Sequence, residues 1–120
     1  MHHLLKDPYT FDPIEAAALL SLMANPVRID VLRRILEREW DVSALSVDLN
    51  ITQSALSQHL AKLRGGGLVR TRRAAQQILY SSASKEVKAI FAALDAFGAM
   101  PTGEISQGQR AKRLPRIKKI

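Results

Sequence analysis

The chain has 120 residues, 47% of them apolar, with no cysteine and a net charge of +7. This length suits one globular domain with one core, and the apolar fraction excludes a chain that is disordered throughout. The lack of cysteine excludes disulfides, thiolate metal sites and thiol redox switches. The sequence contains no apolar run long enough to cross a membrane, and residues 1–8 are too short and too polar for a signal peptide. We therefore expect a protein of the bacterial cytoplasm.

The positive charge is concentrated in the second half of the chain. Residues 49–85 include six basic residues and no acidic one, whereas most acidic residues precede this stretch. Residues 104–120 carry six basic residues and one acidic residue, a net charge of +5. This asymmetry favours a polyanionic partner, and specifically nucleic acid, that contacts the second half of the chain.

The first third of the chain predicts an arm at residues 1–11 and then two helices. Asp12 can cap a helix that has Pro13 at its first position, and residues 14–24 are apolar almost all round. A small domain cannot easily cover such a helix completely, so we expect a second copy of the chain to cover it. Asn25 and Pro26 cap and begin the next helix, whose apolar spacing continues to about residue 38.

Two helices joined by a short turn are predicted next. Residues 39–42 form a connector in which Trp40 packs against the edge of the domain and Val42 joins a one-bridge strand. Ser43 is the predicted cap of a short helix at residues 44–49. After the turn at residues 50–52, Thr52 caps a helix that ends at the three glycines 65–67. Such a pair is a helix-turn-helix.

The helix that follows Thr52 has the composition of a DNA recognition helix. Leu56, Leu60 and Leu63 form its apolar stripe. The opposite face has no acidic residue and offers short hydroxyls and two amides, which can approach base edges and phosphates closely. The residues predicted to contact bases are Gln53, Ser54, Ser57, Gln58 and His59. For His59 a second role is equally open, namely a hydrogen bond to the start of another helix.

Two extended runs, at residues 68–72 and 77–81, predict a β-hairpin with its tip at residues 73–76. A basic hairpin that follows a recognition helix is a wing, whose arginines would meet phosphates or enter a minor groove. The residues predicted to contact the DNA backbone are Thr52, Lys62, Arg64, Arg70, Arg72 and Arg73.

A last helix is predicted from its cap at Ser84 to Gly98. Its apolar face and the first helix are the large apolar surfaces that remain, so we predict a homodimer through these two helices. The residues expected at the interface are Ile14, Ala18, Leu22, Val87, Ile90, Phe91 and Leu94. The fold class is therefore mainly α with a small β-hairpin, a winged helix-turn-helix at residues 12–98, followed by a basic tail at residues 99–120.

The chain resembles the ArsR family of bacterial winged-helix regulators over roughly residues 14–97. The resemblance rests on Met-Ala-Asn-Pro-Val-Arg at 23–28, on Gln-Ser-Ala-Leu-Ser-Gln-His-Leu-Ala-Lys-Leu at 53–63, and on Gly-Leu-Val at 67–69 with the arginines that follow. The sequence of the predicted recognition helix, together with the serines after the hairpin, looks most like that of the rhizobial nodulation repressors. The resemblance implies a homodimer, an imperfect palindrome near a promoter, and usually repression.

The sensor positions of the family are not matched. Many members bind metal through cysteines on the helix before the recognition helix, and others bind zinc between the last helices through Asp and His. Here residues 42–49 contain neither cysteine nor histidine, and the last helix has Glu86 and Asp95 but no histidine, although zinc needs about four ligands. We expect no metal, no cofactor and no thiol switch.

The sequence thus predicts a nucleoid-associated transcriptional regulator that binds double-stranded DNA as a dimer. It would act as a repressor and place residues 53–62 in the major groove. Two alternatives remain. One is an interaction module that binds a protein partner through the basic tail, and the other is an architectural nucleic-acid binder with little sequence preference. An enzyme is the weakest interpretation, because no phosphate loop, carboxylate pair or nucleophile–base spacing is present. A membrane partner is not expected.

Overall fold

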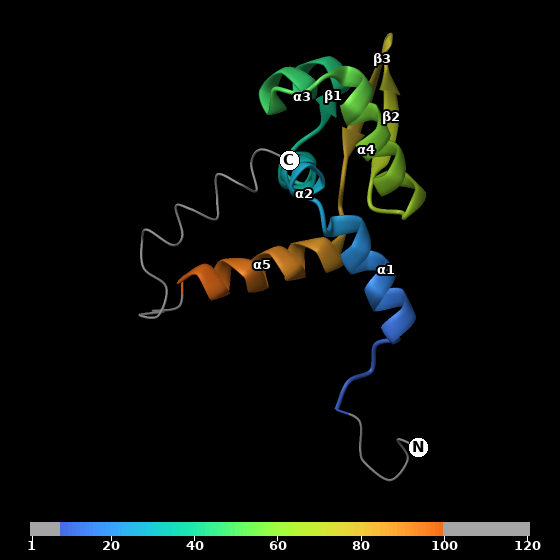
Figure 1. The fold of residues 1–120 in the computed structure, drawn as a ribbon. Coiled ribbons are helices and arrows are strands. Elements are labelled where there is room, and N and C mark those ends of the chain that lie inside the picture. Colours follow the sequence, from blue (N-terminus) through green and yellow to red (C-terminus); the bar gives the residue numbers. More distant parts are fainter. Residues whose placement is uncertain (1–7, 100–120) are drawn as a thin grey trace.

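The computed structural model describes residues 8–99, and within them the chain forms five helices and three strands (Figure 1). In chain order these are α1 (Pro13–Met23), α2 (Pro26–Ile35), β1 (Trp40–Asp41), α3 (Val42–Leu49), α4 (Gln53–Gly65), β2 (Arg70–Ala74), β3 (Gln77–Ser81) and α5 (Lys85–Ala99). The predicted basic tail beyond its first residue, Ala99, and most of the predicted N-terminal arm lie outside the described residues.

Short polar side chains fix where the helices begin. Asn25 Oδ1 accepts hydrogen bonds from the N–H groups of Val27 and Arg28 at 2.9 and 3.1 Å, and Thr52 Oγ1 accepts one from Ala55 at 3.0 Å. Each bond satisfies a backbone donor that has no partner within its helix. The predicted caps Asp12 and Ser84 are confirmed in the same way, by bonds from Ile14 and Val87.

The predicted start of α3 and the predicted end of α2 are wrong. Asp41 Oδ1 accepts the N–H of Ala44 at 2.8 Å, so Asp41 and not Ser43 caps α3, and Val42 belongs to the helix and not to a strand. Helix α2 ends at Ile35, about three residues earlier than predicted. The Arg34 carbonyl accepts the N–H of Glu37 at 3.1 Å, a bond over three residues that tightens the end of the helix, and it also accepts the indole Nε1–H of Trp40 at 3.2 Å.

The three strands form one antiparallel sheet in the order β1-β3-β2. The hairpin is confirmed, but β2 is shifted two residues later than predicted and the loop shrinks to Ala75 and Gln76. The reason is the end of α4, where Gly67 has a φ of +80° and the N–H of Leu68 donates to the Leu63 carbonyl at 3.0 Å. This left-handed cap turns the chain inward, so that Leu68 is buried before the strand begins.

The core lies between α2, α3, α4 and the first turns of α5. The predicted stripe Leu56, Leu60 and Leu63 is buried throughout. It packs with residues of the other helices, and the fully buried members of this cluster include Val31, Leu32, Leu45 and Val87. Helix α4 is thereby fixed with its polar face outward.

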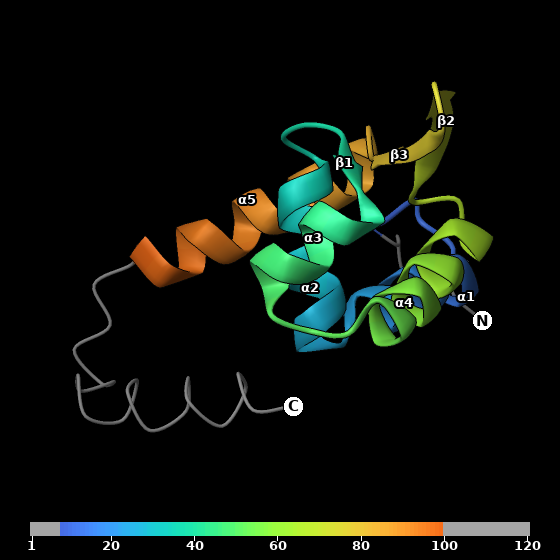
Figure 2. The same ribbon diagram turned by 90° about the horizontal axis from the view of Figure 1, so that it is seen from above.

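Helices α1 and α5 lie on the opposite side of the molecule from α3 and the tip of the hairpin (Figure 1). Viewed from above, α5 extends sideways beyond the helix-turn-helix (Figure 2). It continues through Gly98 to Ala99, so the predicted stop at Gly98 is wrong. Its outer half leaves Leu94 and Phe97 exposed at 49% and 65%, and α1 leaves Ile14 exposed at 79%.

Candidate nucleic-acid interface

The turn between α3 and α4 sets the geometry of the helix-turn-helix. Asn50 adopts a left-handed conformation, φ 57° and ψ 47°, which asparagine tolerates better than most residues. The N–H of Ile51 then donates to the Ser46 carbonyl at 3.1 Å. On the other side of α3, Arg34 Nε lies 2.5 Å from Asp48 Oδ2, an ion pair that joins α2 to α3.

The outward face of α4 carries exposed polar groups that are available for a ligand. Ser54, Ser57, Gln58 and Lys62 are all exposed, and within residues 8–99 none of their side chains makes a hydrogen bond or an ion pair. Acidic side chains do not occur on this helix. The face can therefore offer donors and acceptors to base edges and phosphates without first breaking internal bonds.

Gln53 differs from the other amide on this face. Its Nε2 donates to Ser43 Oγ of α3 at 3.0 Å, which restrains the side chain at the junction of the two helices. The second Nε2 hydrogen and the Oε1 acceptor remain, and these are the two groups that a glutamine uses to read adenine. Sequence reasoning assigned Ser43 to a helix cap, so this contact between α3 and α4 was not foreseen.

His59 lies half-buried at the inner edge of α4 and not on its exposed face. Burial lowers the pKa of His59, and the positive charges of Arg28 and Lys62 lower it further. The side chain makes no hydrogen bond within the described residues, so the structure gives no support to the alternative of a bond to another helix. The guanidinium of Arg28 is held at the end of α1, where it donates to the carbonyls of Leu22 and Ser21 at 2.6 and 3.3 Å.

The hydroxyl of Thr52, at the start of α4, can cap the helix and can also donate a hydrogen bond to a ligand. Its Oγ1 accepts the N–H of Ala55, which caps the helix, while the hydroxyl hydrogen has no acceptor in the described part of the chain. The residue is exposed. A helix start that carries a free hydroxyl donor is suited to an anionic oxygen such as a phosphate.

The predicted wing arginines are not equivalent. Arg72 forms a two-bond ion pair with Glu39, Nε to Oε2 at 2.5 Å and Nη2 to Oε1 at 2.7 Å. A hydrogen bond from the Arg72 guanidinium lowers the pKa of Glu39, and the same bond raises that of Arg72. Arg70 and Arg73 are exposed and have no such partner within residues 8–99. No local pattern indicates this pair, because the two residues are 33 positions apart.

The surfaces of α1 and α5 contain most of the residues predicted at a dimer interface. Ile14, Ala18 and Leu94 are exposed, and the chain covers Leu22, Ile90 and Phe91 only in part. Val87 is the exception, because its exposed fraction is 0% and it packs in the core of its own chain. The prediction that Val87 contacts a second copy is therefore wrong.

Residues 8–99 contain no group of three or more histidine and acidic side chains placed to hold a metal ion. None of the helices in this range is long and apolar enough to span a membrane.

Comparison with known proteins identifies relatives of the whole fold. Residues 25–71 match the family model described as bacterial regulatory protein, arsR family. The nodulation protein NolR of Rhizobium meliloti is 51% identical over 84 residues, which cover 69% of each chain. The transcriptional activator HlyU of Vibrio cholerae is 50% identical over 76 residues, 63% of this chain and 70% of HlyU.

Solved structures agree with the sequence relatives. The crystal structure of NolR from Sinorhizobium fredii superimposes with a TM-score of 0.68 at 44% identity, covering 74% of this chain and 95% of NolR. Reduced HlyU from Vibrio cholerae gives a TM-score of 0.65 at 45% identity, covering 72% and 92%. The fold is thus a winged helix-turn-helix, and the chain belongs to the arsR family of bacterial regulatory proteins.

Proposed function

We propose that the protein is a sequence-specific transcriptional regulator that binds an imperfect palindrome near promoters as a homodimer and represses transcription. The observation that carries this proposal is the outward face of α4, where Ser54, Ser57, Gln58 and Lys62 are exposed, unpaired in the described part of the chain and free of acidic neighbours on the helix. The family consists of bacterial regulatory proteins, and one relative named above, HlyU, is a transcriptional activator. Such a protein would act at the chromosome, in the bacterial cytoplasm.

Base readout falls to α4 in this proposal. Gln53, Ser54, Ser57 and Gln58 would contact base edges in the major groove, with His59 at the margin. Thr52, Lys62, Arg64, Arg70 and Arg73 would contact the backbone, which supplies affinity but little sequence information. Two copies would place their α4 helices in half-sites about 10 or about 20 base pairs apart, centre to centre.

The homodimer would form through α1 and α5. Ile14 and Leu94 expose 79% and 49% of their surface, and leaving such side chains in water is unfavourable by about 25 cal/mol for each Å² of apolar surface. A second copy related by two-fold symmetry would cover both helices and would match the symmetry of a palindrome. Because the sequence has no cysteine, we propose that regulation uses no thiol-based switch.

The test is selection of bound fragments from sheared genomic DNA, followed by sequencing, with two variants. Gln58→Ala should lose about tenfold or more of the preference for the selected site over random duplex, since a good bidentate contact discriminates by about 1–3 kcal/mol. Lys62→Ala is the matched comparison. It should weaken binding to the selected site and to random duplex by about the same factor as each other.

Enrichment of one imperfect palindrome upstream of a few genes would support the proposal. Fragments without a shared sequence would contradict it and would favour an architectural binder. An effect of Gln58→Ala that is equal on all duplexes would refute its role in base readout.

A further inference from the structure

The ion pair between Glu39 and Arg72 crosses the whole sheet. Glu39 precedes β1, Arg72 lies in the middle of β2, and β3 runs between these two strands. Both carboxylate oxygens are engaged, one by Nε and one by Nη2 of the guanidinium. Paired hydrogen bonds of this kind are the most directional that arginine makes, and here they occupy the Nε–Nη2 edge, one of the two edges through which a guanidinium can bind a phosphate. The carboxylate also neutralises the charge that would attract a phosphate to Arg72.

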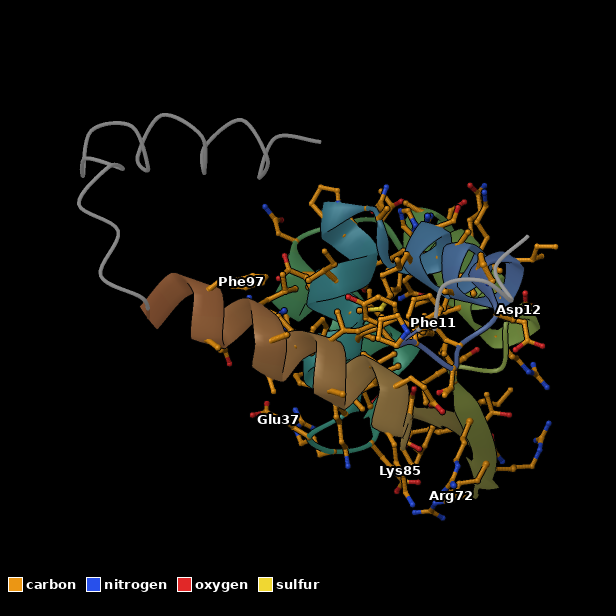
Figure 3. All side chains as sticks on the ribbon, turned by 90° about the horizontal axis from the view of Figure 1, so that it is seen from below. Phe11, Asp12, Glu37, Arg72, Lys85 and Phe97 are labelled. Carbon is orange, nitrogen blue, oxygen red and sulfur yellow. The ribbon has the colours of Figure 1, made fainter. Side chains whose placement is uncertain are left out.

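The register of the sheet places Arg72 and Arg73 on opposite faces. Thr71 and Trp40 both pair with Tyr80, and Trp40 and Tyr80 pack against the hydrophobic core. Side chains alternate along a strand, so Arg73 shares the face of Thr71 while Arg72 points the other way. Figure 3 shows the labelled Arg72 on the side of the hairpin away from the yellow-green helix α4.

We propose that Glu39 occupies the guanidinium of Arg72 in place of a DNA phosphate, so that Arg72 braces the wing and Arg73 makes the phosphate contact at this part of the hairpin. The inference rests on the proposed DNA-binding function. Arg72, which the sequence predicted as a backbone contact, thereby becomes a positioning residue. Glu39 becomes a residue that limits the affinity and the salt dependence of DNA binding.

Salt dependence provides the test, because each phosphate contact steepens the slope of log K against log salt by about 0.9. The binding of a fluorescent random-sequence duplex to the full chain would be measured from about 50 to about 200 mM KCl. Glu39→Gln removes the negative charge that holds Arg72 and keeps the size of the side chain at position 39. The slope of log K against log salt should steepen by about 0.9 in this variant. Between about 50 and about 200 mM KCl the variant should therefore lose about 3.5-fold more affinity than the wild type.

Glu37→Gln is the matched control. Glu37 is exposed, lies two positions earlier in the same connection and makes no ion pair within residues 8–99, yet its substitution removes the same charge. It should alter affinity only through the general charge of the protein.

The arginine variants test the same assignment. Arg72→Ala should leave the slope unchanged. In a protein that already carries Arg72→Ala, Glu39→Gln should behave like Glu37→Gln. Arg73→Ala should flatten the slope by about 0.9.

Two outcomes would overturn the proposal. One is a flatter slope for Arg72→Ala, which would mean that Arg72 reaches a phosphate despite Glu39. The other is an equal slope for Glu39→Gln and Glu37→Gln. Failure of the wild-type protein to bind duplex DNA would be a different result, because it would refute the DNA-binding function itself.

Discussion

Thr52 allows the stability of α4 and its contact with DNA to be separated by substitution. Its Oγ1 accepts the N–H of Ala55 at 3.0 Å, and the same hydroxyl has a hydrogen to donate. Thr52→Ala removes both functions and should lower the free energy of unfolding by about 1 kcal/mol, the usual contribution of an N-cap. Thr52→Ser keeps both and should behave as the wild type. Thr52→Asp keeps the acceptor, since aspartate caps helices well, but replaces the donor by a negative charge.

The aspartate variant should therefore be as stable as the wild type and bind DNA at least about tenfold more weakly, because a hydrogen bond to a charged group contributes about 1.5–3 kcal/mol. Urea unfolding followed by circular dichroism measures stability, and duplex titration at fixed salt measures affinity. Wild-type affinity of Thr52→Asp would show that position 52 does not face a phosphate. Unchanged stability of Thr52→Ala would refute the capping argument.

Two further predictions concern His59 and the tip of the wing. Burial first, and then the charges of Arg28 and Lys62, lower the pKa of His59 below 6.5. The unfolded chain therefore binds this proton more readily, so stability should be complete above pH 6.5 and decrease as the pH falls below it. His59→Gln should show a smaller difference in urea midpoint between about pH 7.5 and about pH 5.5, and an equal difference would contradict the assignment. At the wing tip, Ala75 has a φ of 57°. The left-handed conformation costs alanine about 1–2 kcal/mol, more than the roughly 0.5–1 kcal/mol that glycine loses in entropy, so Ala75→Gly should stabilise the fold by about 0.5–1 kcal/mol. Gln76→Gly, at a position without a positive φ, is the control and should not stabilise; a loss of stability in Ala75→Gly would contradict the reasoning.

Local signals in the sequence were sufficient where the physical cause is local. The caps Asn25 and Thr52 act on N–H groups two or three residues away, so a short window contains the whole interaction. The stripe Leu56, Leu60 and Leu63 follows from helical spacing alone, and its burial leaves the polar face of α4 outward. The helix-turn-helix, the wing and the family were predictable for this reason.

The errors at element boundaries have a different origin. Asp41 and Ser43 are both good caps, and the sequence does not say which one the chain will use. The short strand β1 decides, because pairing Trp40 with Tyr80 fixes the backbone just before Asp41. The end of α2 also involves this residue, because the indole of Trp40 donates to the Arg34 carbonyl six positions earlier, beyond the reach of the helical pattern.

The polar face of α4, the start of most helices and the preference for a polyanion thus follow from the order of residues along the chain. Which of the positive charges are free depends on how the chain folds. Arg72 and Arg73 are neighbours of the same type, yet strand alternation sends one to Glu39 and leaves the other unpaired in the described part of the chain. Val87 likewise has the spacing of an interface residue and is nevertheless buried in its own core. Both outcomes depend on residues far away in the sequence, and a pattern read along the chain does not contain such contacts.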